Sequence, residues 1–356
     1  YVKVGRKGNA KWNFSETFTW SSPGFDLNDM GYMKETDYLM NETEIMYRQT
    51  DIWKIFRYNA FTLSQKNMWN YGGTPFSNNA SLRWQSMTMN RYEWDVKETF
   101  AWNWLDSRLL RGGPDVRFGS YFLTSAKFNT DKAKRMMFML KYEGDHNFEG
   151  NRFNTISPSL TFRLGNHVYL SGQLDYAWNT DEMQYVATTS PLSSSSLTPY
   201  YYVMGHMDQK TYGLTLKLQV NVTPDISIQF YGAPFTSIAK YDDFKLAADT
   251  KSHTFENRFQ RIDPDHLTYA DGVYTIGEGA GQMPFRNPDF RFNEFRSNLV
   301  ARWEYLPGST LYFVWEHRMS NRDNWYSSGW GSNLDRMWGL PATNTFMIKM
   351  NYWFNL

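Results

Sequence analysis

Apolar and polar side chains alternate in many short segments of this chain, and the C-terminal segment shows the pattern clearly. Successive side chains of a strand point to opposite faces, so residues 346–356 have one apolar face and one mostly polar face. Such a strand suits a bilayer on one side and water on the other, and outer-membrane barrels present a terminal strand of this kind for assembly. The apolar face of this predicted assembly strand has six residues: Phe346, Ile348, Met350, Tyr352, Phe354 and Leu356.

The alternation recurs, which gives about fourteen predicted strands in all. Each is close to the roughly 9–11 residues that a tilted strand needs to cross a bilayer. The clear segments are residues 11–20, 91–104, 134–144, 154–164, 168–178, 212–222, 226–234, 295–305 and 311–317; the weaker ones are 38–47, 53–63, 81–89 and 116–128.

The predicted connections alternate between short and long. Residues 129–132, 165–167, 223–225 and 306–309 are short and contain Gly, Pro, Asn or Asp, as tight turns require. The long connections are residues 21–37, 64–79, 179–209, 236–293 and 320–344. Short periplasmic turns and long extracellular loops are typical of outer-membrane barrels.

We therefore predict an all-β fold: a transmembrane, antiparallel, up-and-down β-barrel of about 14–16 strands that occupies residues 1–356 as one domain. Residues 1–7 continue the pattern as an inward strand. Because bacterial single-chain barrels have even strand numbers, either these residues are peripheral to fourteen strands, or a sixteenth strand comes from residues outside this sequence. A barrel of this width has an aqueous lumen or a plug.

Composition changes this picture little. The 37 Lys and Arg residues nearly balance the 36 Asp and Glu residues, which gives no support for a nucleic-acid partner. The chain has no cysteine, which excludes disulfides and thiol catalysis. Aromatic residues make up 18% of the chain, in keeping with the aromatic girdles of barrels. The first residue is Tyr1, and we expect an upstream periplasmic module that this sequence lacks.

Charged residues of both signs occupy the predicted lumen face. They either set the selectivity of a pore or form ion pairs that fix the wall and hold a folded-in loop, and their interleaved signs favour the second reading. The lumen-lining candidates are Arg91, Glu93, Asp95, Lys97, Arg296, Arg302, Glu304, Glu316, Arg318 and Lys349.

Glu16 and Glu98 fall on the apolar faces of their strands. A lipid-facing carboxylate is unfavourable, so we expect a β-bulge that turns each side chain inward. A second protein that covers the barrel wall is the alternative.

The longest connection, residues 236–293, is the candidate gate, because loops of this length are usually functional or disordered. Its carboxylates do not have EF-hand spacing, and we predict no metal, cofactor or catalytic residue. A hydrolase that uses His266 and its neighbouring acids stays an alternative. The gate candidates are Tyr241, Asp242, Asp243, Asp263, Asp265 and His266.

An ordered set of motifs resembles a known family, the domain of unknown function 5916. The motifs are Pro-Gly-Phe at 23–25, Asn-Asp-Met-Gly-Tyr at 28–32, Thr-Pro at 223–224, Phe-Tyr at 230–231, Pro-Phe at 234–235, Arg-Trp-Glu-Tyr at 302–305, Pro-Gly-Ser at 307–309, and Lys349, Tyr352 and Trp353. The resemblance implies an outer-membrane barrel of Bacteroidota, often carried behind a module similar to carbohydrate-binding family 9. It implies no activity.

For function, we expect a non-enzymatic conduit for solutes, or a part of a nutrient-uptake system, in the Gram-negative outer membrane. The alternative is an anchor or scaffold subunit of a larger outer-membrane assembly. Expected partners are outer-membrane lipid and lipopolysaccharide, with other outer-membrane or periplasmic proteins as further candidates.

Overall fold

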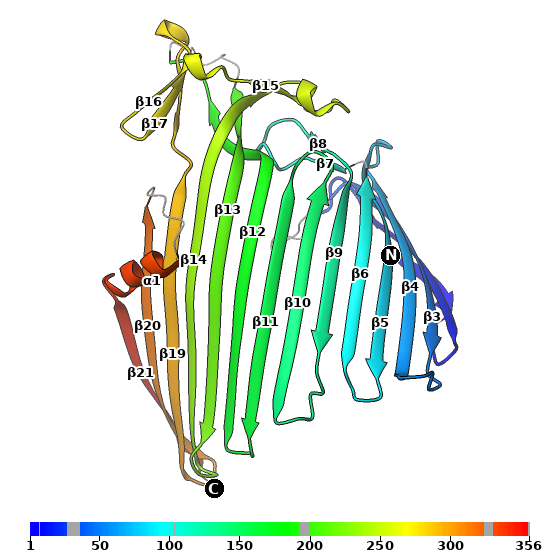
Figure 1. Ribbon diagram of the computed structural model, residues 1–356, viewed down its shortest axis with the longest axis vertical. Helices are drawn as coiled ribbons and strands as arrows, with labels where there is room; N and C mark the ends of the chain where they lie inside the picture. The colour runs from blue at the N-terminus through cyan, green and yellow to red at the C-terminus, as the bar shows by residue number, and fades with distance from the viewer. Residues whose placement is uncertain (7, 27–35, 103, 193–199, 324–329, 355–356) are drawn as a thin grey trace.

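The computed structural model describes residues 1–6, 8–26, 36–102, 104–192, 200–323 and 330–354. Antiparallel strands dominate these residues and form one large sheet (Figure 1). The strands along it are β1 (Val2–Arg6), β2 (Trp12–Ser21), β3 (Tyr38–Gln49), β4 (Phe56–Trp69), β5 (Pro75–Thr88), β6 (Glu93–Trp102), β9 (Tyr121–Asn129), β10 (Met136–Asn147), β11 (Arg152–Leu164), β12 (Val168–Thr189), β13 (Tyr201–Asn221), β14 (Ile226–Ala247), β19 (Phe290–Leu306), β20 (Ser309–Asp323) and β21 (Thr343–Asn351).

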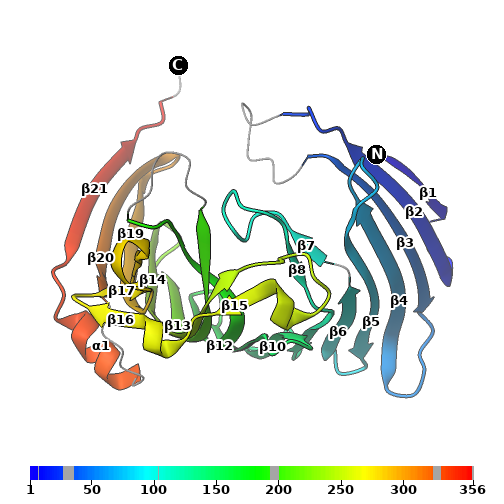
Figure 2. The ribbon, with the colours of Figure 1, turned by 90° about the horizontal axis from the view of Figure 1, so that it is seen from above.

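Strand order in this sheet follows sequence order from β1 to β21. The described part of the sheet has 16 strands, and β15 (Phe259–Arg261) pairs beside β14 off the main path, which leaves fifteen along it. Seen from above, the sheet curves into an arc whose edge strands, β1 and β21, do not meet (Figure 2). The predicted all-β antiparallel fold is confirmed, whereas closure into a barrel is not observed.

The connections sort to the two ends of the sheet much as predicted. At one end, residues 165–167, 222–225 and 307–308 are short turns. At the other end, residues 22–37, 103–120, 190–200, 248–289 and 324–342 are longer, although β10 and β11 are joined there by the short turn 148–151. We call these the turn end and the loop end.

Several predicted connections were wrong because the strands continue beyond their alternating segments. Residues 64–79 are mostly strand, since β4 and β5 leave only residues 70–74 between them. β12, β13 and β14 have 22, 21 and 22 residues, so the predicted links 179–209 and 236–293 shrink to 190–200 and 248–289. The weak segment 116–128 is two elements, because β8 (Val116–Phe118) pairs with β7 (Trp104–Asp106) outside the main sheet.

The C-terminal strand also differs from its prediction. β21 spans Thr343–Asn351, so Phe346, Ile348 and Met350 lie on the strand, whereas Tyr352 and Phe354 follow its end. Leu356 lies outside the described residues.

Cross-strand register places the large apolar side chains on one face of the sheet. Phe14 lies opposite Ile45, Ile45 opposite Leu63, and Leu63 opposite Leu82, and large apolar residues recur on the same face of the later strands, although Leu82 itself lies opposite Glu98. We call this series the apolar belt, and it includes Phe14, Ile45, Leu63, Leu82, Phe100, Phe122, Phe138, Leu160, Leu170, Leu216, Phe230, Leu299, Phe313 and Ile348.

The apolar face is convex and the polar face is concave. Helix α1 (Trp330–Trp338) lies outside the arc in Figure 2, and its Trp338 ring packs at 4.9 Å against Phe295 of the apolar face. The β7–β8 hairpin lies inside the arc, over polar-face residues such as Asp145 and Asn179. The sheet is therefore curved so that its polar positions face the hollow side.

The predicted bulges at Glu16 and Glu98 were wrong. The register of β2 with β1 and β3 is continuous through Glu16, and that of β6 with β5 and β9 is continuous through Glu98. Both carboxylates stay on the convex face and accept hydrogen bonds there. Asn41 and Thr43 donate to Glu16, the latter at 2.6 Å, and Thr124 donates to Glu98 at 2.7 Å.

Among the described residues, no helix has both the length and the apolar character needed to cross a membrane. The single α-helix described, α1, has 9 residues.

The β19–β20 turn offers a test of the turn chemistry. Gly308 follows Pro307 with φ of +77°, the positive φ that a type II turn requires at this position. Its backbone N–H donates to the Glu304 carboxylate at 3.1 Å. We expect Gly308→Val to lower the free energy of unfolding by about 1–2 kcal/mol, because a side chain in the left-handed region is strained. Denaturant titration of the refolded protein measures this. Gly24→Val is the control, because a Cβ there meets open space and its φ lies outside the left-handed region.

Candidate functional site: the mouth of the concave face

The charged residues predicted to line a lumen lie on the concave face, with one exception. Register connects Asp95 through Lys127 to Lys141, and Arg302 through Tyr312 to Lys349. Arg91 is the exception, because it lies in the β5–β6 turn with φ of +60°. The predicted residues on this face are Glu93, Asp95, Lys97, Arg296, Arg302, Glu304, Glu316, Arg318 and Lys349.

Most of these charges pair with a neighbour of opposite sign. Arg83 donates to Asp95 at 2.7 Å through Nε. Lys132 pairs with Glu93, and Arg302 pairs with Glu304, each at 2.5 Å. Arg296 and Arg318 both reach Glu294, at 2.8 and 2.9 Å. Within the part of the chain that the structure describes, Lys97, Glu316 and Lys349 form no ion pair.

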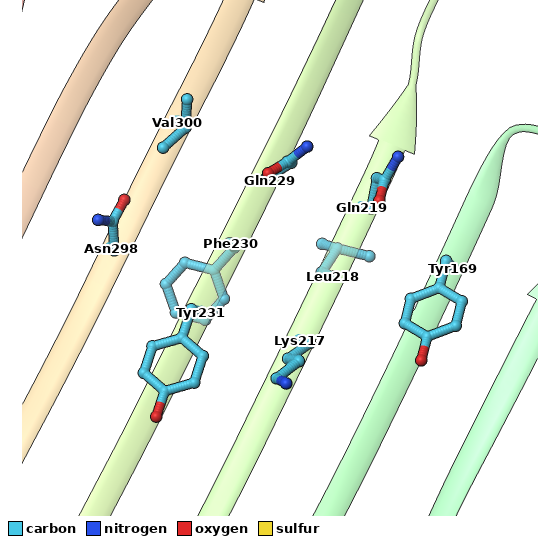
Figure 3. A pocket seen from close by; sticks show the side chains of 9 residues that line it. All are labelled: Tyr169, Lys217, Leu218, Gln219, Gln229, Phe230, Tyr231, Asn298 and Val300. Carbon is cyan, nitrogen blue, oxygen red and sulfur yellow. The ribbon is translucent and has the colours of Figure 1, made fainter.

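A hollow of about 410 Å³ lies on the concave face near the turn end, across β12, β13, β14 and β19 (Figure 3). Its polar lining comes from alternate positions of these strands. Sequence reasoning missed it, although the repeated polar positions carry the signal. The residues that line it are Tyr169, Lys217, Leu218, Gln219, Gln229, Phe230, Tyr231, Asn298 and Val300.

At the loop end, the β7–β8 hairpin folds into the arc (Figure 2). Asp106 fixes its turn, because its Oδ1 accepts hydrogen bonds from the backbone N–H groups of Arg108 and Leu109, at 2.7 and 3.0 Å. Leu110 and Val116 are fully buried and anchor the hairpin in a cluster with Phe259. The hairpin is thus a packed element and not a free loop.

The hairpin separates two cavities at the loop end of the concave face, a region that we call the mouth. Trp104 and Asp106 line both cavities. The first cavity, of about 550 Å³, extends over β4 and β5 and includes Lys66, Asn70 and Asn79. The second, of about 350 Å³, extends over β9 to β12. Its lining includes Phe118, Tyr121, Asp145, Asn147, Asn151, Arg152, Phe153, Asn179 and Asp181.

Residues 248–262 of the β14–β19 connection cross the arc above the hairpin (Figure 2), and we call them the cover segment. The cover segment is joined to the hairpin by paired contacts. The Thr250 hydroxyl donates to the carbonyl of Asp115 at 2.7 Å, the N–H of Arg117 donates to the carbonyl of Thr250 at 2.9 Å, and Lys251 pairs with Asp115 at 2.8 Å.

A buried ion pair fixes the cover segment to the wall. Arg258, at the end of η2 (Phe255–Arg258), is 1% exposed and donates to both carboxylate oxygens of Glu149, at 2.7 and 3.0 Å. The same guanidinium donates to the carbonyls of Arg117 and Ser252, both at 2.7 Å. Glu149 also accepts from the N–H of Gly119 at 2.9 Å. Hydrogen-bond partners from within the protein therefore surround both Arg258 and Glu149.

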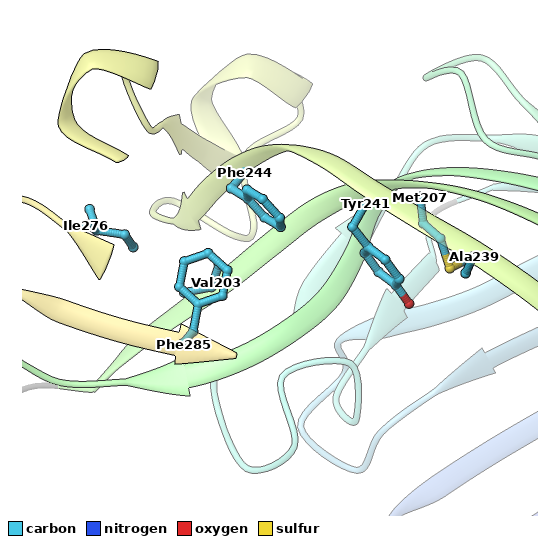
Figure 4. Packing of buried hydrophobic residues seen from close by; sticks show 7 residues of the cluster. All are labelled: Val203, Met207, Ala239, Tyr241, Phe244, Ile276 and Phe285. Carbon is cyan, nitrogen blue, oxygen red and sulfur yellow. The ribbon is translucent and has the colours of Figure 1, made fainter. Parts of the chain in front are cut away.

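The rest of the connection, residues 263–289, contains a small separate sheet. The β16 (Leu267–Ala270), β17 (Val273–Ile276) and β18 (Met283–Arg286) strands form their own sheet, and η4 (Gly279–Gly281) joins the last two. Phe244 of β14 packs against Phe285 at 5.0 Å between ring centroids (Figure 4). The buried residues of this cluster are Val203, Met207, Ala239, Tyr241, Phe244, Ile276 and Phe285.

Three of the six gate candidates are strand residues, not loop residues. Tyr241, Asp242 and Asp243 lie in β14. Tyr241 is 9% exposed, and its backbone N–H donates at 2.7 Å to the Asp289 carboxylate. Burial raises the pKa of that carboxyl. Asp243 lies 3.4 Å from the buried Lys245 ammonium of the same strand and 3.6 Å from the exposed Arg261 of the cover segment.

The other three gate candidates lie at the surface: Asp263 caps the N-terminus of η3 (Pro264–His266), and Asp265 and His266 lie in it. His266 and Asp263 are 3.9 Å apart with side chains 65% and 61% exposed, and Asp265 donates its backbone N–H to Asp263. The structure does not bring them to the cavities. A better-supported His–carboxylate contact was missed: His206 lies 3.1 Å from Glu182 and 3.6 Å from Asp208, at the loop-end half of β12 and β13.

The chain belongs to a family whose description is a domain of unknown function, DUF5916, because the model of that family matches residues 2–356. Comparison with curated proteins and with solved structures finds no match.

The Arg258–Glu149 pair predicts how the cover segment is held. In Arg258→Met, the buried Glu149 carboxylate loses its partner, which costs about 3–5 kcal/mol. We expect the cover segment to detach, with faster proteolysis and faster hydrogen exchange within residues 248–262. Arg261→Met is the matched control, because Arg261 is 75% exposed and its pair with Asp243 contributes about 1 kcal/mol at most. Equal rates of proteolysis and hydrogen exchange within residues 248–262 of the two variants would show that Arg258 does not hold the cover segment.

Proposed function

We propose that this member of the DUF5916 family forms the wall of a conduit in a Gram-negative outer membrane, and that small polar solutes pass along its concave face. The observation that carries the proposal is the two-faced sheet, with the apolar belt on the convex side and mixed polar and charged groups on the concave side. Lipid on one side and water on the other favour this arrangement.

Aromatic rings border the apolar belt, as expected where a wall meets the membrane interfaces. On β2 and β6, Trp12 and Trp94 lie toward the turn end, and Trp20 and Trp102 lie toward the loop end. The interval between the rings of one strand suits the roughly 9–11 residues of a tilted transmembrane strand. This supports lipid and lipopolysaccharide as the surroundings of the convex face.

Strand parity supports closure by one more strand. The fifteen strands of the described path are all antiparallel to their neighbours, so β1 and β21 run in the same direction. Direct pairing of these edges would be parallel. One further strand, supplied by residues outside this sequence, would pair antiparallel with both edges and give the even number that bacterial barrels have.

The two cavities at the mouth support a role in selecting the solute that enters. Cavities of about 550 and 350 Å³ fall within the range of small-molecule sites. Both combine the Trp104 ring with the Asp106 carboxylate, and amide side chains such as Asn70 and Asn179 line one or the other. An aromatic surface with convergent carboxylates and amides suits a small solute with many hydroxyl groups or a cationic one. The cover segment lies over this route and is the proposed gate.

No cofactor or catalytic step is part of this proposal. The hydrolase alternative gains no specific support, because His266 in η3 and Asp263 at its N-cap are both largely exposed and do not line the cavities.

Conductance tests both the conduit and its gate. We expect the purified full-length protein to give single-channel currents in planar bilayers. Replacement of residues 249–261 by the same number of Gly and Ser residues should raise the conductance, because it removes Arg258 and frees the mouth. The same replacement of residues 267–276, which lie at the side of the arc in Figure 2, is the control and should leave the conductance unchanged.

Absence of single-channel currents from both the native protein and the 249–261 variant would reject the conduit. Equal conductance of the two would keep the conduit but reject the cover segment as its gate.

A further inference from the structure

The convex face differs between its two halves. From β10 to β21, the middle positions of the apolar belt are apolar, as at Leu140, Leu174 and Phe230. From β2 to β9, polar side chains occupy the same middle positions, between aromatic rings toward each end. We call this set the polar patch: Glu16, Asn41, Thr43, Gln65, Asn67, Asn78, Glu98 and Thr124.

Six residues of the polar patch form one continuous surface, whereas Ala80, Leu82 and Phe100 separate the other two, Glu98 and Thr124, from them. Register places Asn67 between Asn41 and Asn78 in a single row across β3, β4 and β5, and places Gln65 between Thr43 and Ala80 in the next row. Glu16 and Glu98 lie at the two sides, each bonded to its own neighbours. Gln65, at the centre, is exposed.

Hydrocarbon is a poor solvent for such a surface. A carboxylate or amide that faces lipid near the bilayer midplane is unfavourable, and the local hydrogen bonds to Glu16 and Glu98 satisfy only part of their capacity. A protein surface that supplies donors and acceptors removes this penalty. This step depends on the proposed membrane location of the apolar belt.

We propose that the polar patch is the interface between two copies of this chain. The argument is the complementarity of the patch with itself. Asn and Gln amides are both donors and acceptors, so the amides of Asn41, Gln65, Asn67 and Asn78 can pair with the same amides of a second copy. A two-fold axis along the membrane normal near Gln65 brings the amides of β3 from one copy toward those of β5 from the other. Both copies keep the same orientation in the membrane, as a closed isologous dimer requires.

The geometry also limits the contact. Tilted strands of the two copies cross, so contact is tightest at β4, where Leu63, Gln65 and Asn67 follow one another on the convex face. Ala80 beside Gln65 leaves room for close approach.

The absence of cysteine from the chain allows a direct test. In Gln65→Cys, the two thiols near the axis should form an intermolecular disulfide in most chains on mild oxidation in native outer membranes, since a disulfide requires Cα atoms about 5.5–6 Å apart. Leu63→Cys, which leaves every residue of the patch intact, should crosslink as well. Leu216→Cys, an exposed belt position on β13, is the control and should stay monomeric.

A bimane label on the same cysteines, with brominated lipids as quenchers, separates this proposal from the proposed function. We expect strong quenching at residue 216 and weak quenching at residue 65. Weak quenching at residue 216 would reject the membrane location itself. Strong quenching at both positions without a disulfide would show that the patch faces lipid and overturn the dimer. A crosslink from residue 65 to a chain of different mass would also overturn it, in favour of another protein.

Discussion

A continuous path of antiparallel pairing is the constraint on which the rest of this structure depends. Each strand of the main path satisfies its backbone N–H and C=O groups through the strands beside it, so pairing runs from β1 to β21. Among the described residues, local register shifts occur in the β4–β5, β12–β13, β13–β14 and β19–β20 pairs. A fixed register turns the alternation within each strand into a property of the whole sheet. Phe14 on β2 and Ile348 on β21 therefore lie on the same face although more than three hundred residues separate them in sequence.

This constraint explains what the sequence could predict. Where one face of a strand is apolar and the other polar, as in β2, β6 and β10, a period of two identifies both the strand and its faces. In residues 64–69 of β4 the prediction failed because polar residues occupy both faces, and in β14 it failed because both faces are covered. Thr236, Ser237, Ile238 and Ala239 of β14 are all buried, so the alternation disappears and the strand was taken for a loop. The signal is lost because packing on both sides removes the difference between faces.

The mouth was beyond prediction for a different reason. The β7–β8 hairpin and the cover segment depend on contacts between residues far apart in sequence, such as Arg258 with Glu149 and Thr250 with Asp115. A lone arginine or glutamate in a polar loop carries no sign that the two will meet. Only the folded wall, with Glu149 in the β10–β11 turn and η2 beyond β14, brings them together.

The two convex carboxylates show how local sequence rules reach their limit. A charge on an apolar face predicts a bulge, because a shift of one residue moves the side chain to the other face. In the ladder, however, a bulge at Glu16 or Glu98 would also displace every aromatic ring beyond it on the same strand, including Phe18 and Phe100. Keeping the register and supplying hydrogen bonds from Asn41, Thr43 and Thr124 leaves the belt intact. The consequence is a convex face that is more polar between β2 and β9 than between β10 and β21.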